Sequence, residues 1–264
     1  MDQWIVAAIL GVVEGLTEFL PISSTGHLII AGHVLSFTGL KAETFQIVIQ
    51  LGAILAVLLL YWSRFIGLLR PTCPEGLSGV RGLWLLFLTS LPASIVGLLA
   101  HSYIKEQLFK PVPVALALLV GAVCIFIVEA LPRREVVRNL DTITPKIALG
   151  IGFCQCLALW PGFSRSASTI MGGMLLGVER KTSAEYSFIA AVPIMFAATG
   201  YDFLKNYQLF GPSDLVFLAI GFIVSFLSAW VAIRGFIFLL GRLTLRSFAL
   251  YRIALACLVL WFFF

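Results

Sequence analysis

Long apolar runs separated by short polar segments follow one another along most of the chain, and their lengths predict membrane-crossing helices. An α-helix rises 1.5 Å per residue, so about 20 apolar residues cross the ~30 Å hydrocarbon core of a bilayer. Runs of this kind occupy roughly 44–62, 82–100, 112–131, 184–203, 214–233 and 248–264. We therefore expect an all-α polytopic membrane protein with six transmembrane helices.

Two further apolar regions are interrupted by polar clusters and predict re-entrant helical hairpins. The first covers 4–20 and resumes after the break as far as Leu35, and the second covers 147–160 and resumes to about Val178. Each second arm has only about 10–14 residues, or about 15–21 Å of helix, which is too short to cross the core. We expect each region to enter the bilayer and return to the side from which it came.

The order of a hairpin followed by three spans occurs twice, at an offset of about 140 residues. The repeats extend over approximately 1–135 and 145–264, within a single integral membrane domain, 1–264. Because an odd number of spans inverts the second copy, this order predicts an inverted-topology repeat whose broken helices meet near the bilayer midplane. Residues 4–20 follow no basic segment and contain two acids, so we expect no cleavable signal peptide.

Composition and charge agree with lipid as the main solvent. Of the 264 residues, 60% are hydrophobic and 12% are charged, whereas roughly 25% are charged in a soluble domain. The net charge of +5 comes from short loops, so it indicates membrane orientation and no nucleic-acid partner. One predicted side holds Arg64, Arg70, Arg81, Arg133, Arg134, Arg138, Lys146, Arg180, Lys181, Arg234, Arg242 and Arg246, and the other holds Lys41, Lys105, Lys110 and Lys205. This bias places the mouth of the first hairpin outside and that of the second in the cytoplasm.

Two carboxylates precede the first break. Glu14 and Glu18 are four residues apart, so one helical face presents both. Adjacent carboxylates repel unless a cation or a proton lies between them, and a divalent metal, Mg²⁺ or Ca²⁺, matches oxygen ligands of this kind. The alternative is that the acids bond to neighbouring backbone or pair with Arg165.

A hydroxyl-rich stretch opens the second arm of the first hairpin, with Ser23, Ser24, Thr25, Gly26 and His27 in succession. Free N–H groups at a helix start, together with hydroxyls, bind anions. A helix cap is the ordinary alternative for a serine here. His27 could take a proton from Ser24, act as a general acid or attack phosphorus itself, or be only a core residue.

The second break repeats this design with a cation. Arg165 can bind a phosphate through two parallel hydrogen bonds, or pair with a glutamate. The other candidate substrate-binding residues are Gly162, Ser164, Ser166, Thr169 and Gln155, which matches Glu14 in the repeat. Together the two tips indicate binding of a metal-bridged phosphate on a lipid, with phosphoryl transfer as the chemistry.

Two stretches closely resemble the signatures of the bacterial undecaprenyl-pyrophosphate phosphatase (bacitracin-resistance protein) family. They are Glu14-Gly-Leu-Thr-Glu18-Phe-Leu-Pro-Ile-Ser-Ser-Thr-Gly-His27 and Pro161-Gly-Phe-Ser-Arg165-Ser-Ala-Ser-Thr169. The resemblance extends over the whole chain, and Ala167 stands where many members have glycine. It implies hydrolysis of undecaprenyl pyrophosphate to undecaprenyl phosphate and phosphate in the bacterial inner (plasma) membrane, which recycles the carrier lipid for peptidoglycan synthesis. It also implies a divalent metal and a site open to the periplasm.

The resemblance implies that Glu14 and Glu18 hold the metal or serve as the base, and that Arg165 binds the pyrophosphate. Ser24 with His27 as its base is the favoured nucleophile, while attack by His27 or water stays open. A transporter or flippase of lipid phosphate is the alternative function, suggested by the inverted repeat. Expected partners are the polyprenyl pyrophosphate and membrane lipids, and the sequence is compatible with a homodimer.

Overall fold

The computed structural model describes residues 2–70, 76–132, 134–211, 214–240 and 243–263. Within these residues, six helices are long and apolar enough to cross a membrane, as predicted. They are α3 (Leu40–Leu60), α5 (Gly79–Leu99), α7 (Pro111–Ala130), α10 (Arg180–Asn206), α11 (Leu215–Leu240) and α12 (Arg246–Phe263). Both α10 and α11 are longer than the predicted spans. Among the predicted positions, Arg133, Arg242 and Phe264 lie outside the described residues.

The two interrupted regions form pairs of shorter helices. The first pair is α1 (Gln3–Thr17) and α2 (Ser24–Val34); the second is α8 (Pro145–Gln155), its 3-10 extension η3 (Cys156–Leu159) and α9 (Arg165–Leu175). The predicted breaks are therefore confirmed. The connecting segments contain α4 (Trp62–Leu68), α6 (His101–Tyr103), the π-helical η1 (Ile104–Leu108), η2 (Leu140–Thr142) and η4 (Tyr207–Leu209). The helix α4 lies in a segment that the sequence analysis treated as a loop.

The turn before each second arm has the same backbone geometry. Ser23 and Ser164 have positive φ angles of 69° and 78°, which side chains rarely adopt. Each serine caps the helix that follows, because its hydroxyl accepts a hydrogen bond from the N–H of Gly26 or of Ala167. The chain therefore reverses sharply at both places, and the free N–H groups of α2 and α9 begin at the reversal.

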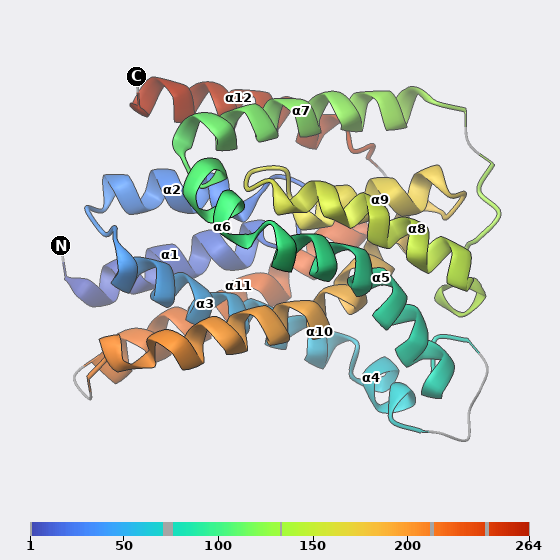
Figure 1. Cartoon of the computed structure of the whole chain (residues 1–264), viewed down its shortest axis with the longest axis horizontal. Coiled ribbons are helices and arrows are strands. Elements are labelled where there is room, and N and C mark those ends of the chain that lie inside the picture. The colour runs from blue at the N-terminus through green and yellow to red at the C-terminus, as the bar shows by residue number, and fades with distance from the viewer. Residues whose placement is uncertain (1, 71–75, 133, 212–213, 241–242, 264) are drawn as a thin grey trace.

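The two helix pairs pack against spans from the opposite half of the chain. Helix α1 lies along α11, and α8 lies along α5, while α7 and α12 run side by side (Figure 1). The contact of α1 with α11 is close because Gly15 has no side chain: a methyl group there would lie 2.7 Å from Ser228 Cβ and 2.8 Å from the Ala229 nitrogen. This packing brings the turns of the two pairs toward the middle of the molecule.

Apolar side chains surround the two turns and also cover the outside of the long helices. Phe19 and Phe188 meet edge to face, with ring centroids 5.4 Å apart, beside the first turn. Outward-facing residues such as Trp84, Phe238 and Val231 are more than half exposed. Because water would disfavour so large an apolar surface, the chain is a multi-pass membrane protein.

Candidate active site

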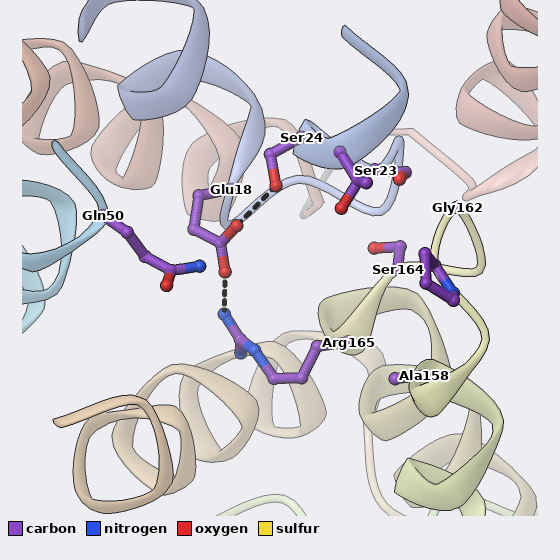
Figure 2. A pocket seen from close by; sticks show the side chains of 10 residues that line it. Glu18, Ser23, Ser24, Gln50, Ala158, Gly162, Ser164 and Arg165 are labelled. Atoms are coloured by element: carbon purple, nitrogen blue, oxygen red, sulfur yellow. Dashed lines mark hydrogen bonds and ion pairs between the residues drawn. The ribbon is translucent and has the colours of Figure 1, made fainter. Parts of the chain in front are cut away.

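The turns of the two helix pairs enclose one polar cavity. Its volume is about 140 Å³. It is lined by Glu18, Ser23, Ser24, Thr25, Gln50, Ala158, Pro161, Gly162, Ser164 and Arg165 (Figure 2). These residues come from both turns and from α3, so segments far apart in sequence share one site, as the sequence analysis expected.

Glu18 lies between a hydroxyl and a guanidinium. Its Oε2 accepts a hydrogen bond of 2.6 Å from Ser24 Oγ, and its Oε1 accepts one of 3.3 Å from Arg165 Nη2 (Figure 2). The side chains of Glu18 and Arg165 are only 8% and 14% exposed. A buried ion pair is stable only when further hydrogen bonds satisfy its members, and Ser24 supplies one. The carboxylate is therefore placed to take the Ser24 proton.

Arg165 is fixed on its other side but keeps one N–H group free. Its Nη1 donates to the carbonyl and to the hydroxyl of Ser187 on α10, at 3.2 and 3.4 Å. The guanidinium also lies 5.3 Å from the centroid of the Phe19 ring. Its buried Nε–H has no hydrogen-bond partner. An unpaired buried donor is unfavourable, so an anionic oxygen entering the cavity would satisfy it.

The remaining residues of the second turn divide into two groups. Gly162 and Ser164 line the cavity. Ser166 and Thr169 are buried outside it: Ser166 donates to the Leu20 carbonyl at 2.8 Å, and Thr169 shares a 2.6 Å hydrogen bond with Ser187. The Ser166 bond joins the two turns directly, so its role in the structure is to hold them together.

Two residues near the start of α2, Gly26 and His27, have different surroundings from those that the sequence suggested. Gly26 faces α7, where an added methyl would lie 3.2 Å from Leu118 Cδ1, and it does not line the cavity. His27 Nδ1 lies 2.7 Å from the Ser23 carbonyl and must donate, because a carbonyl only accepts. Its Nε2 lies 2.7 Å from the Tyr251 hydroxyl, which then donates to it. The acceptor for the Ser24 proton is Glu18, and both nitrogens of His27 are already bonded elsewhere.

Glu14 and Gln155 are both deeply buried, and each has an unpaired oxygen. Glu14 Oε2 and Gln155 Oε1 have no hydrogen-bond partner, and neither residue lines the cavity. The Gln155 amide donates to the Thr89 carbonyl at 3.4 Å. The matching repeat positions therefore hold two similarly placed polar groups, of which only Glu14 can carry a charge.

The carboxyl oxygens of Glu14 and Glu18 are of the kind that a hard divalent cation prefers. Within the described part of the chain, no three His, Cys, Asp or Glu side chains cluster as metal ligands. Mg²⁺ commonly uses only one or two carboxylates and takes its other ligands from water and substrate phosphate. Glu14, one helical turn from Glu18, has an unpaired oxygen, whereas both oxygens of Glu18 are bonded to Ser24 and Arg165.

Three residues that contact the site were not singled out from the sequence: Gln50, Tyr251 and Arg252. Figure 2 shows the Gln50 amide beside Glu18. All three lie in predicted spans, and a polar side chain within an apolar span is a recognised sign of function. That sign was available for Gln50 and Arg252, whereas the bond of Tyr251 to His27 joins residues 224 positions apart.

Known proteins resemble this chain over almost its full length. An undecaprenyl-diphosphatase of Maridesulfovibrio salexigens is 69% identical over 262 residues, which cover 99% of both chains. Proteins of the same name from Nitratidesulfovibrio vulgaris and Lawsonia intracellularis are 64% and 56% identical, over 99% and 98% of both chains. Residues 7–258 match the family described as bacitracin resistance protein BacA, so the chain belongs to that family.

Proposed function

We propose that this protein hydrolyses undecaprenyl diphosphate to undecaprenyl phosphate and inorganic phosphate. The observation that supports this most strongly is the Glu18 carboxylate held between the Ser24 hydroxyl and the Arg165 guanidinium in a buried cavity. The proposal agrees with the name of the similar proteins. In the bacterial inner membrane, this reaction would return the carrier lipid to peptidoglycan synthesis.

The cavity binds the diphosphate through complementary charge. Arg165 lines the cavity with a buried Nε–H that has no hydrogen-bond partner, and its guanidinium supplies a fixed positive charge. Helices α2 and α9 both begin at the cavity, and helix N-termini attract phosphate through their free N–H groups. A headgroup bound there would leave the prenyl chain in the surrounding lipid.

Ser24 and Glu18 carry out the chemistry. Ser24 Oγ attacks the terminal phosphorus while Glu18 accepts the hydroxyl proton. The bond from phosphorus to the bridging oxygen breaks, and undecaprenyl phosphate leaves with the electron pair and takes the proton from Glu18, which restores the carboxylate. Water then attacks the phosphoserine while Glu18 accepts a water proton. Glu18 returns this proton to Ser24 Oγ as the bond from phosphorus to Oγ breaks, which releases phosphate and restores Ser24. Arg165 stabilises the negative charge on the phosphoryl oxygens in both steps.

A divalent cation would be held by Glu14 and Glu18, since their oxygen donors suit Mg²⁺ or Ca²⁺. Such an ion would neutralise charge on the phosphate oxygens. Removing divalent ions with a chelator should therefore abolish phosphate release, and adding Mg²⁺ or Ca²⁺ back should restore it. Release that persists after exhaustive chelation would refute the metal requirement.

The two helix pairs are proposed as re-entrant hairpins of an inverted repeat, with the site open to the periplasm. Three features support this: the matching positive φ at Ser23 and Ser164, the packing of each pair on a span of the other half, and the bias of Lys and Arg to one side. Single cysteines in the loop 36–39 should react with a membrane-impermeant thiol reagent added outside intact cells. Cysteines at the exposed positions 138 and 139 should react only after the cells are opened.

The direct test uses purified protein in detergent with undecaprenyl diphosphate. Release of phosphate, and its loss in Glu18→Gln, is the expected result. The same protein in sealed vesicles tests the flippase alternative, which predicts that the lipid moves across the bilayer with its diphosphate intact. Movement without phosphate release would overturn the enzymatic proposal.

A further inference from the structure

Arg252 is a buried cation whose five N–H groups are all used. It lies on α12 with 0% of its surface exposed. An arginine side chain has five N–H donors and no acceptor. Its Nε donates to Leu118 O (3.2 Å), Nη1 to Pro21 O (3.2 Å) and Phe163 O (2.8 Å), and Nη2 to Ala117 O (3.1 Å) and Gly162 O (3.1 Å).

These acceptors belong to three separate segments. Pro21 lies in the first turn, Gly162 and Phe163 lie in the second, and Ala117 and Leu118 lie on α7. One side chain thus connects both halves of the active site to the frame formed by α7 and α12. In the described part of the chain, its hydrogen-bond partners are all carbonyls and no carboxylate pairs with it.

The space around the guanidinium fits this role. Gly121 on α7 faces Arg252, and a methyl group added there would overlap Nη2 and lie 3.3 Å from the Phe163 carbonyl. A charged group at membrane depth is expensive unless it is satisfied, so a residue serving only to fill space would be apolar. The full set of charge-assisted hydrogen bonds accounts for an arginine at this position.

We propose that Arg252 is a positioning residue that sets the separation of the two turns. This inference rests on the proposed diphosphatase function. Pro21 is three residues after Glu18, and Phe163 is two residues before Arg165, so the carbonyls that Arg252 holds are close in the chain to both members of the ion pair. A shift of either turn would move Glu18 relative to Arg165, and a misplacement of about 1 Å can reduce catalysis by about 100-fold.

Two different substitutions perturb the hydrogen bonds that Arg252 makes to the two turns. Arg252→Lys keeps the charge, but its single nitrogen has three donors and cannot reach all five carbonyls. Gly121→Ala leaves the arginine itself unchanged, but the added methyl group pushes Arg252 Nη2 away from the Gly162 carbonyl. Gly235→Ala on α11 is the matched control, because a methyl group there meets no atom within 4 Å.

The kinetic expectation is a fall in kcat of about 10- to 100-fold per folded molecule, with KM changed by less than about threefold. Ser24 and Arg165 are still present to bind the ground state, so the loss falls on the transition state. The folded fraction is taken from size-exclusion chromatography, and the melting temperature is recorded for each variant. If both variants melt at a lower temperature but keep the wild-type kcat per folded molecule, Arg252 is only structural and the proposal fails.

A second measurement does not depend on activity. Hydrogen–deuterium exchange of the protein in detergent should increase at residues 19–25 and at 160–166 together in both Arg252→Lys and Gly121→Ala, and remain unchanged in Gly235→Ala. Unchanged exchange at either turn would overturn the positioning role even if the enzyme is active. If exchange increases at both turns in the two variants but the wild-type protein releases no phosphate, the connection between the turns is supported and the diphosphatase function is rejected separately.

Discussion

The 2.6 Å hydrogen bond from Ser24 Oγ to Glu18 Oε2 predicts that the two residues act as one catalytic unit. The perturbation is a double-mutant cycle of Ser24→Ala, Glu18→Gln and the combined variant. Gln has nearly the shape of Glu, so Glu18→Gln keeps the volume of the cavity. The substitution removes the negative charge of residue 18, which serves both as the base for Ser24 and as the ion-pair partner of Arg165. Once either residue is changed, the proton transfer between them no longer takes place.

The size of the effect follows from the contacts. A positioned general base contributes about 10²- to 10⁴-fold, or about 2.7–5.4 kcal/mol at 1.36 kcal/mol per tenfold. Glu18→Gln also loses a charge-assisted hydrogen bond to Arg165, worth about 1.5–3 kcal/mol. We therefore expect Ser24→Ala to lower kcat by at least about 100-fold, and Glu18→Gln to lower it by as much or more.

The assay is phosphate release from undecaprenyl diphosphate at saturating substrate, with each variant normalised to its folded fraction. The combined variant should be no slower than Glu18→Gln alone, since residues that act as a unit are strongly non-additive. Ser90→Ala is the matched control, because the Ser90 hydroxyl donates to the Leu86 carbonyl within α5 and does not line the cavity, and this variant should keep wild-type turnover. If the two single losses multiply, Ser24 and Glu18 act independently and the proposed mechanism is wrong.

Further predictions concern the surroundings of the site. Tyr251→Phe removes one hydrogen bond worth about 0.5–1.5 kcal/mol, so kcat should fall by less than about 15-fold. His27→Gln perturbs two such bonds, so kcat should fall by less than about 160-fold, and a loss of about 1,000-fold or more would make His27 the base. Gly15→Ala should destabilise the protein by about 1–3 kcal/mol, measured as a lower melting temperature than Gly235→Ala, because its methyl overlaps α11; equal melting temperatures would contradict the close packing. Burial raises the pKa of Asp141, but hydrogen bonds from Leu77 N–H and from Arg64 lower it by more, so its pKa lies below the usual value. The stability it adds is present above about pH 4 and is lost as the pH falls below that, so wild-type protein should lose more thermal stability than Asp141→Asn between pH 5 and pH 3; parallel curves would exclude this contribution.

The sequence predicted the helices well because their physical causes are local. Apolar length alone defines the six spans, and the broken regions follow from polar clusters in runs too short to cross. The sequence analysis gave a pairing of the acids with Arg165 as the alternative to a metal site, and the structure places Arg165 Nη2 3.3 Å from Glu18 Oε1. The extra length of α10 and α11 was not predicted, because a helix can continue beyond the hydrocarbon into the interface.

The sequence could not assign His27, because its role depends on a distant partner. The spacing of His27 and Ser24 on one short helix is compatible with proton transfer between them. The fold instead brings Tyr251 of α12 to one ring nitrogen and directs the other to the Ser23 carbonyl. Helix spacing limits which neighbours a side chain can reach, but only tertiary packing determines which of them it bonds.

Two buried arginines show how a structure separates roles that look equal in the sequence. Arg165 and Arg252 are both cations within apolar surroundings, and intramembrane charge alone would assign function to each. All five donors of Arg252 are bonded to carbonyls of its own chain, so nothing remains for a ligand. Arg165 keeps a buried Nε–H without a partner beside a polar cavity, and this is the donor that an incoming phosphate would satisfy. At membrane depth, an unpaired donor is costly, so its persistence at the cavity argues for a substrate group that completes it.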